Sequence, residues 1–194
     1  MLKQRKQDFP LDLNKKMNVA YINLCTEAEG PYKRMAIWFQ GCNILCEGCC
    51  NPELQPIVPA HIMTVQEVID IAKSAREDFG IEGVTFLGGE PVLQDGLVHL
   101  VYALKETGLG VILFTGKTVE TLDNLLINQV DLIIDGRFDE NQIDESRNLI
   151  GSKNQRLHFV TDRYINNKGW FFDVREKQVE INLSTNALVT GDVV

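Results

Sequence analysis

The sequence predicts an α/β fold with a parallel sheet, and three observations lead to that prediction. Four short apolar runs alternate with segments of helical periodicity, which is the pattern of βαβ units. Each run ends in a polar or glycine-containing turn, and the carboxyl ends of parallel strands share one edge, where functional residues gather. The composition, 44% hydrophobic and 24% charged, fits a domain with a substantial core. The runs are AIWFQ (36–40), VTFLG (84–88), VILFT (111–115) and VDLIID (130–135).

Residues 64–80, TVQEVIDIAKSAREDFG, predict the first helix. Thr64 followed three residues later by Glu67 forms a capping box, in which the two residues satisfy each other's N–H groups at the helix start. Gly80 follows the last periodic residue, where a left-handed glycine commonly ends a helix. The apolar face of this helix comprises Val65, Val68, Ile69, Ala72 and Phe79.

The rest of the chain predicts two more helices and further strands. One helix is expected from Gln94 or Asp95 to Gly108, and a shorter one at about 119–128. A polar stretch then leads to RLHFVT (156–161), which predicts another strand. FFDV (171–174) and QVEINLS (178–184) predict two short strands in a C-terminal hairpin or edge addition.

Charge and hydropathy exclude several classes of function. The formal net charge is −8, and the first sixteen residues hold five Lys or Arg against two Asp, so the remainder carries −11. An acidic body argues against a nucleic-acid partner, which requires a basic patch. No stretch approaches the length of about 20 apolar residues that spans a bilayer, and the polar N-terminus does not resemble a secretory signal. We therefore expect a cytoplasmic protein without a membrane partner, in which clustered cysteines are metal ligands rather than disulfides.

Four of the five cysteines lie in GCNILCEGCCNPE (41–53), directly after a predicted strand. Cys42, Cys46 and Cys49 have the spacing C-x3-C-x2-C, and three thiolates can hold three irons of a [4Fe–4S] cluster while the fourth iron binds a small molecule. Structural zinc is the alternative, but it prefers four ligands from two such pairs, and only one pair is present. Cys50 would have difficulty reaching the same metal as Cys49, and Cys25 is expected to be a spare buried thiol.

The cysteine run resembles the signature of the radical S-adenosylmethionine (SAM) superfamily, and GCNILCEGCCNPE is especially similar to the activating proteins of anaerobic ribonucleotide reductase. The likeness extends to GVTFLGGEPVLQ, ILFTGKT, VDLIIDGRF and GSKNQR, and it spans roughly residues 18–160. It implies a partial (β/α) barrel of the radical SAM type with a short C-terminal β extension. The expected parts are a polar extension (1–17), the radical SAM core (18–162) and the β extension (163–194).

The resemblance also implies where SAM binds. Backbone groups of the glycine turn at residues 88–91 would hold the amino end of SAM, while its amino and carboxylate groups chelate the iron that has no cysteine ligand. Taken alone, that turn is an ordinary strand–helix turn, and Asp135 is equally suited to opening the turn before Gly136. LFTGKT is not a phosphate loop, since position 111 is Val where that motif requires Gly. The implied SAM site comprises Gly48, Cys49, Cys50, Gly88, Gly89, Glu90, Pro91, Thr115 and Asp135.

The implied activity is that of a glycyl-radical enzyme activase. The reduced cluster would cleave SAM to methionine and a 5′-deoxyadenosyl radical, which would take a hydrogen from a glycine of a partner such as anaerobic ribonucleotide reductase. A reduced flavodoxin or a ferredoxin-type protein is the expected electron donor. The cluster and SAM carry the chemistry, so no side chain is assigned as a general base. Two alternatives stay open: a radical SAM enzyme acting on a small molecule, nucleotide or peptide, and a non-catalytic metal-binding module.

Overall fold

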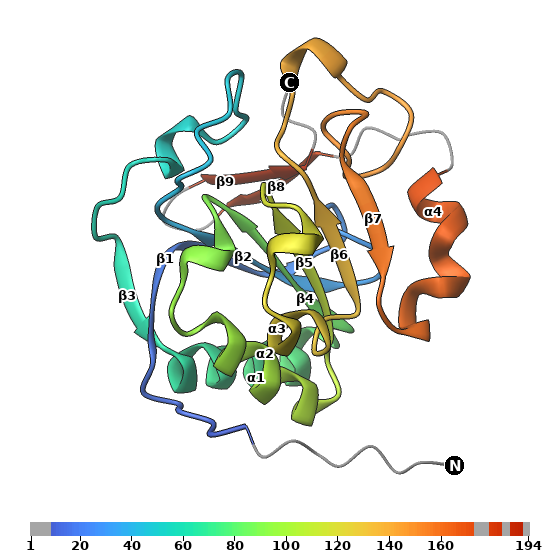
Figure 1. The fold of residues 1–194 in the computed structure, drawn as a ribbon. Coiled ribbons are helices and arrows are strands. Elements are labelled where there is room, and N and C mark those ends of the chain that lie inside the picture. The colour runs from blue at the N-terminus through green and yellow to red at the C-terminus, as the bar shows by residue number, and fades with distance from the viewer. Residues whose placement is uncertain (1–8, 173–178, 184–186, 192–194) are drawn as a thin grey trace.

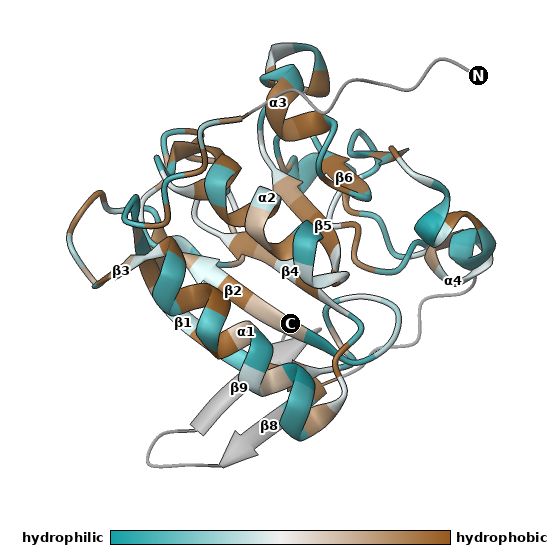
Figure 2. Ribbon diagram, turned by 90° about the horizontal axis from the view of Figure 1, so that it is seen from below, coloured by the Kyte–Doolittle hydropathy of each residue, from teal (hydrophilic) through white to brown (hydrophobic). Residues whose placement is uncertain are grey.

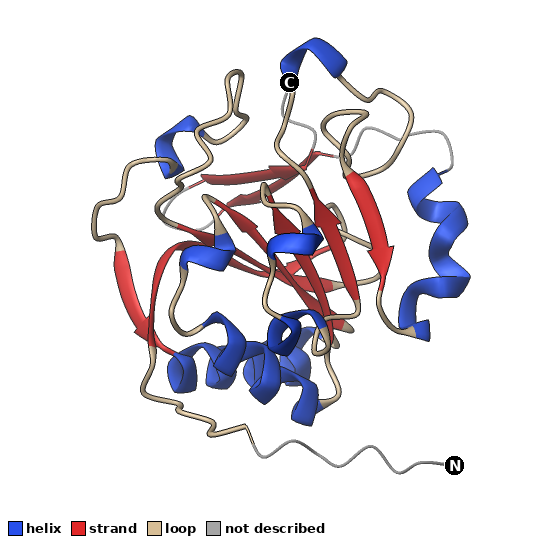
Figure 3. Ribbon diagram, viewed as in Figure 1, coloured by secondary structure: helices blue, strands red, loops and turns tan. Residues whose placement is uncertain are grey.

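The computed structural model describes residues 9–172, 179–183 and 187–191. Their core is a mixed seven-stranded sheet with helices on both faces (Figures 1 and 3). The strands are β1 (Lys16–Thr26), β2 (Arg34–Phe39), β3 (His61–Thr64), β4 (Gly83–Gly88), β5 (Gly110–Thr115), β6 (Leu132–Asp135) and β7 (Arg156–Phe159), with β8 (Val179–Leu183) and β9 (Ala187–Gly191) in a separate hairpin. The α-helices are α1 (Val65–Phe79), α2 (Leu97–Thr107), α3 (Asn124–Ile127) and α4 (Lys168–Phe172).

The strand order β3-β1-β2-β4-β5-β6-β7 places four parallel strands, β2, β4, β5 and β6, at the centre of the sheet. Strands β1, β3 and β7 pair antiparallel at the two sides, so the sheet is open between β3 and β7. This open α/β sheet confirms the predicted fold class. The antiparallel strands β1 and β3 were not foreseen, and their pairing extends the sheet beyond the predicted parallel units.

Helices α1 and α2 bury their apolar faces on one side of the sheet, where the main core includes Phe39, Phe86 and Leu104. In Figure 2 the strands are mostly hydrophobic, whereas α1 carries both hydrophilic and hydrophobic residues, as a helix with one solvated face does. The capping box of α1 is confirmed, because Thr64 and Glu67 each accept the other's N–H. Gly80 ends this helix in the left-handed conformation at φ 69°.

Two predicted elements differ from the structure. The helix expected at about 119–128 is divided into a 3-10 turn, Val119–Thr121, and α3, because Asp123 accepts the N–H of Leu125 and starts a new helix. The strand expected at FFDV is wrong at its first two residues, which end α4. Phe171 is fully buried there against Phe159 and Trp170, so packing on β7 and α4 outweighs the β propensity of its aromatic ring. Asp173 and Val174 lie outside the described residues.

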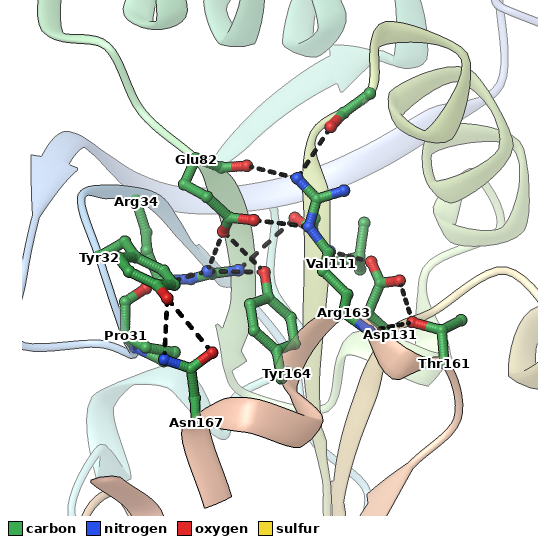
Figure 4. Close-up of polar contacts among 12 residues, drawn as sticks. Pro31, Tyr32, Arg34, Glu82, Val111, Asp131, Thr161, Arg163, Tyr164 and Asn167 are labelled. Atoms are coloured by element: carbon green, nitrogen blue, oxygen red, sulfur yellow. Dashed lines mark hydrogen bonds and ion pairs between the residues drawn. The ribbon is translucent and has the colours of Figure 1, made fainter.

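The N-terminal ends of β2, β4 and β5 are closed by the network drawn in Figure 4. Arg34 is fully buried and donates hydrogen bonds to Thr85 Oγ1 (2.8 Å), Glu82 Oε2 (2.9 Å) and Tyr164 Oη (2.8 Å), as well as to backbone carbonyls. Glu82 also accepts from Arg163 at 2.5 Å. The segment after β7 is thereby fixed to the strand starts. No helix in the described part of the chain has the length and apolar composition needed to cross a membrane.

Candidate functional site

The carboxyl ends of the parallel strands meet at one rim, as predicted. The backbone N–H of Gly89 donates to Phe39 O at 2.8 Å, and that of Glu90 donates to Gly41 O at 2.9 Å. These two bonds join the end of β4 to the end of β2 and the start of the cysteine loop, residues 41–56. At the other side of the rim the N–H of Gly136 donates to Lys117 O at 3.0 Å, which joins the ends of β6 and β5.

The glycine turn at the end of β4 has no room for side chains. Gly88 has φ 103°, and a Cβ atom there would lie 2.6 Å from the backbone nitrogen of Phe39. A Cβ atom on Gly89 would overlap the carbonyl oxygen of Gly41. Both obstacles are backbone atoms, which cannot turn aside as a side chain does. The two glycines therefore allow the close approach of β4 to the cysteine loop, in addition to the positive φ that the turn requires.

The base of the cysteine loop is fixed by backbone hydrogen bonds. Gly41 N–H donates to Leu54 O at 2.8 Å, and Cys42 N–H donates to Gln55 O at 3.0 Å. Gln40, at the strand end directly before the loop, was not assigned a role from the sequence, and it donates from its side chain to Pro56 O at 2.8 Å. In the sequence, the glutamine directly before the loop was the feature that could have pointed to this contact. These contacts give the loop a rigid start and end around the thiols.

The thiols of Cys42, Cys46 and Cys49 are half-buried, whereas Cys50 is exposed. The sulfur of Cys42 accepts the backbone N–H of Ile44 at 3.4 Å. The backbone amides of Phe138 and Asn51 act to lower the pKa values of Cys46 and Cys49. Amide hydrogen bonds to ligand sulfurs are characteristic of iron–sulfur sites, where they tune the cluster. The chemistry of this donor set therefore fits a [4Fe–4S] cluster held by three thiolates.

The environment of the thiols separates Cys49 from Cys50. A hydrogen bond from the Cys50 side chain, aided by the Asn51 N–H, lowers the pKa of Cys49 to about 6. The same bond raises the pKa of Cys50 above its ordinary value. Cys46 has a raised pKa because burial outweighs the Phe138 amide and the charge of Arg137. Of these two adjacent cysteines, Cys49 therefore becomes a thiolate more readily than Cys50.

Within the described residues, no three His, Cys, Asp or Glu side chains converge on a point that would hold a single metal ion. A tetrahedral zinc site needs such convergence, because all its ligands lie about 2.0–2.3 Å from one ion. A [4Fe–4S] cluster makes a different demand, since each cysteine binds a different iron and the sulfurs stay apart. The single cysteine pair, where structural zinc usually takes two, is therefore the feature that favours the cluster over zinc.

Glu90 holds the ends of β4 and β5 together. Its carboxylate is buried, with 1% of the residue exposed, and accepts from Thr115 Oγ1 (2.8 Å), Gly116 N (2.9 Å) and Val92 N (3.0 Å). Burial raises its pKa, although these hydrogen bonds act in the opposite direction. The hydroxyl of Thr115, also predicted to line the SAM site, is engaged by Glu90. Pro91 is buried and begins a short 3-10 helix, Pro91–Leu93.

Asp135 lies at the end of β6 as the buried member of an ion-pair network. Its carboxylate accepts from Arg156 Nε (3.0 Å) and from the Val119 N–H (2.7 Å), and His158 Nε2 lies 3.1 Å away. Burial acts to raise the pKa of Asp135, but these partners hold it below its ordinary value. Arg156 also pairs with Glu120 at 2.9 Å. Arg156 was not predicted as a rim residue, although it closes the GSKNQR motif.

Comparison with known proteins agrees with this geometry. Residues 28–158 match the family described as a 4Fe-4S single cluster domain, a range that contains the cysteine loop and all four parallel strands. The chain is 30% identical over 152 residues to the anaerobic ribonucleoside-triphosphate reductase-activating protein of Enterobacteria phage T4. That alignment covers 75% of this chain and 96% of the relative.

Two further relatives widen the comparison. The anaerobic ribonucleoside-triphosphate reductase-activating protein of Vibrio cholerae is 30% identical over 142 residues, which cover 68% of this chain and 91% of the relative. The pyruvate formate-lyase-activating enzyme of Listeria monocytogenes is 32% identical over 132 residues, covering 62% of this chain but only 52% of that enzyme. The similarity to the reductase-activating proteins thus extends over nearly their whole length.

Proposed function

Because this chain belongs to the family of radical SAM activating proteins with a single [4Fe–4S] cluster, we propose that it generates a glycyl radical on a partner enzyme. The partner that the comparisons favour is an anaerobic ribonucleotide reductase. Two of the relatives are named for activating that enzyme and are covered at 96% and 91% of their length, against 52% for the pyruvate formate-lyase-activating enzyme.

In this proposal Cys42, Cys46 and Cys49 hold three irons of the cluster, and the fourth iron takes SAM. When bound, the cluster and SAM supply the one-electron chemistry that releases methionine and a 5′-deoxyadenosyl radical. The half-buried position of the three cysteines supports this assignment, since it limits the access of water and oxidants to the cluster. Cys50 would lie beside SAM.

The residues of the rim orient SAM in this proposal. Backbone groups of Gly88 and Gly89, at the strand end beside the cysteine loop, would receive the amino end of SAM. Glu90 would act mainly through its buried carboxylate, which fixes Thr115 and Gly116 at the neighbouring strand end. Asp135, held by Arg156, would shape the opposite side of the mouth. None of these groups needs to move a proton, because the hydrogen leaves the partner's glycine as an atom.

We place the reaction in the cytoplasm, with a reduced flavodoxin or ferredoxin-type protein as the electron donor and with neither membrane nor nucleic acid as a partner. The net charge of −8 supports the last point, because phosphate backbones repel an acidic protein. The observation that carries the proposed function is the set of three half-buried cysteines in a loop that is hydrogen-bonded to a glycine turn with no room for side chains.

Anaerobic reconstitution tests the proposal directly. The full chain is loaded with iron and sulfide, reduced with dithionite or a flavodoxin system, and mixed with SAM, with and without an anaerobic ribonucleotide reductase. We expect 5′-deoxyadenosine in the product mixture and the doublet of a glycyl radical in the electron paramagnetic resonance (EPR) spectrum of the reductase. A fully loaded and reduced protein that leaves SAM intact, in both arms, contradicts the radical SAM assignment. Cleavage without a glycyl radical contradicts only the choice of partner.

A further inference from the structure

We propose that residues 151–156, the GSKNQR motif, are a positioning element that holds the cysteine loop in place through residues 135–140. We refer to residues 151–156 as the brace and to residues 135–140 as the connecting segment. The inference rests on the proposed function, because it concerns the cluster that the loop would hold. It assigns a role to a motif that neither the cysteines nor the SAM turn explain.

The brace and the connecting segment lie side by side because β6 and β7 pair antiparallel, with Asp135 opposite Arg156. Side chains of the brace contact four residues of the connecting segment. The contacts are Arg156 Nε to Asp135 Oδ1 (3.0 Å), Gln155 Nε2 to Gly136 O (3.1 Å), Asn154 Nδ2 to Arg137 O (2.7 Å) and Asp139 N to Ser152 Oγ (3.1 Å). The last three bonds hold the backbone of the connecting segment at Gly136, Arg137 and Asp139.

The connecting segment in turn contacts the cysteine loop. Arg137 Nη2 donates to Leu45 O at 2.9 Å, which fixes the loop between two cluster cysteines. Leu45 itself has φ 53°, a left-handed conformation that a leucine keeps only when its surroundings impose it. Glu140 packs so closely on Gly48 that a Cβ atom there would lie 2.9 Å from Glu140 Cβ. Two separate points of the loop are therefore set by the connecting segment.

These contacts also bear on a cluster ligand. Leu45, whose carbonyl accepts from Arg137, directly precedes Cys46, so the connecting segment sets the backbone at that ligand. The number and strength of hydrogen bonds to the sulfurs are among the factors that set the reduction potential of an iron–sulfur cluster. Outer contacts of this kind orient and tune metal sites although they bind no metal themselves. Movement of the connecting segment would therefore change the potential as well as the shape of the loop.

The brace is itself rigid. Arg147 donates to the backbone carbonyls of Gln155 (3.0 Å) and Lys153 (3.1 Å) and pairs with the buried Asp144 at 2.6 Å. The side-chain oxygen of Gln155 accepts the N–H groups of Gly151 and Ser152, both at 3.0 Å. Gln155 thus uses its oxygen to hold the brace and its nitrogen to hold the connecting segment. This division makes the two roles separable by substitution.

The test replaces Gln155 by Glu in the full chain. The new carboxylate still accepts the N–H groups of Gly151 and Ser152. It cannot donate to the carbonyl oxygen of Gly136, and its second oxygen would face that carbonyl oxygen instead. Lys153→Ala is the matched control, because it lies in the same segment, has an exposed side chain and changes the net charge by the same −1. Both variants and the wild type are reconstituted anaerobically and titrated by EPR at a series of applied potentials.

We expect both variants to bind as much iron as the wild type. At a fixed potential, the ratio of reduced to oxidised cluster should fall at least threefold further in Gln155→Glu than in Lys153→Ala, a difference of about 28 mV for one electron. Equal ratios in the two variants overturn the inference. Should Gln155→Glu fail to fold, Asn154→Ala is measured instead, since its exposed side chain makes a single bond to Arg137 O. A wild type that binds no cluster refutes the proposed function, whereas a loaded wild type with unshifted variants refutes only the role of the brace.

Discussion

The two ends of the parallel strands both bury charged side chains, but they use them differently. At the N-terminal ends, every nitrogen of the Arg34 guanidinium donates to an acceptor of the protein, and Glu82 and Tyr164 complete the network. At the carboxyl ends, Glu90 and Asp135 hold strand ends together, while three thiols lie half-buried in the adjoining loop. At the N-terminal ends the buried charged groups bond to one another. At the carboxyl ends the buried carboxylates hold the strand ends beside the cysteine loop.

This difference separates stability from function along the same strands. In α/β proteins the carboxyl ends of strands carry the functional residues, and the opposite ends carry contacts that stabilise the fold. Here the closed network fixes the segment after β7 to the strand starts, so the rim is left to position the cysteine loop. Substitutions at the N-terminal ends should therefore change the free energy of unfolding, whereas substitutions of the cysteines at the carboxyl ends should change cluster binding.

The largest effect is expected at the rim from Cys46→Ala. Removal of this thiol leaves two of three cysteine ligands, so the reconstituted protein should lose the four-iron absorbance and nearly all production of 5′-deoxyadenosine. The circular dichroism spectrum should stay unchanged, because Cys46 is not part of the hydrophobic core. Cys50→Ala is the control and should retain the cluster. A cluster that persists in Cys46→Ala, or disappears in Cys50→Ala, would show that the ligands are assigned wrongly.

The next effect is expected at the closed end from Arg34→Met. Glu82 and the hydroxyl of Tyr164 would lose their buried cationic partner, and removal of one member of a buried pair typically costs about 3–5 kcal/mol. The free energy of unfolding, measured in urea, should fall by that order. Lys33→Met, at an exposed neighbouring position, should change it little. The EPR spectrum of the loaded Arg34→Met protein should match that of the wild type, and an altered spectrum would contradict the separation of the two ends.

A smaller effect distinguishes the two rim carboxylates by pH. The pKa of Glu90 is raised above 4.5 in the folded state, chiefly by burial, so its contribution to stability is lost as pH rises through that raised value. The pKa of Asp135 is held below 3.8, so its contribution is present above pH 3.8 and lost as pH falls through the lowered value. The stability of the wild type relative to Glu90→Gln should therefore decrease with rising pH, whereas relative to Asp135→Asn it should increase. Urea unfolding at several pH values checks this, and parallel trends would contradict the assigned environments.

Local signals in the sequence were sufficient for the parts of the fold that depend on near neighbours. The capping box of Thr64 and Glu67, the glycine at position 80 and the four apolar runs all act within a few residues, and each is found where it was expected. The meeting of the strand ends at one rim follows from parallel pairing alone. The cysteine spacing likewise identifies candidate ligands without knowledge of the fold.

Contacts between distant residues could not be predicted in this way. Glu90 and Thr115 were both singled out, but their mutual hydrogen bond joins residues 25 positions apart and has no local signature. The same holds for Arg156 beside Asp135, and for the brace that explains the GSKNQR motif. Phe171 is helical despite its β propensity, because its ring is buried beneath β7. Tertiary packing determines the conformation and contacts at such positions, and local patterns in a single sequence do not reveal them.

The central claim is that three thiolates hold a cluster whose fourth iron binds SAM beside the glycine turn. Electron–nuclear double resonance of the reduced, loaded protein with SAM carrying ¹⁵N in its amino group and ¹⁷O in its carboxylate tests it most directly. We predict hyperfine coupling of both labels to the cluster, in the wild type and in Cys50→Ala alike. Spectra that are identical with labelled and unlabelled SAM, in a protein that carries a complete reduced cluster, would contradict the claim.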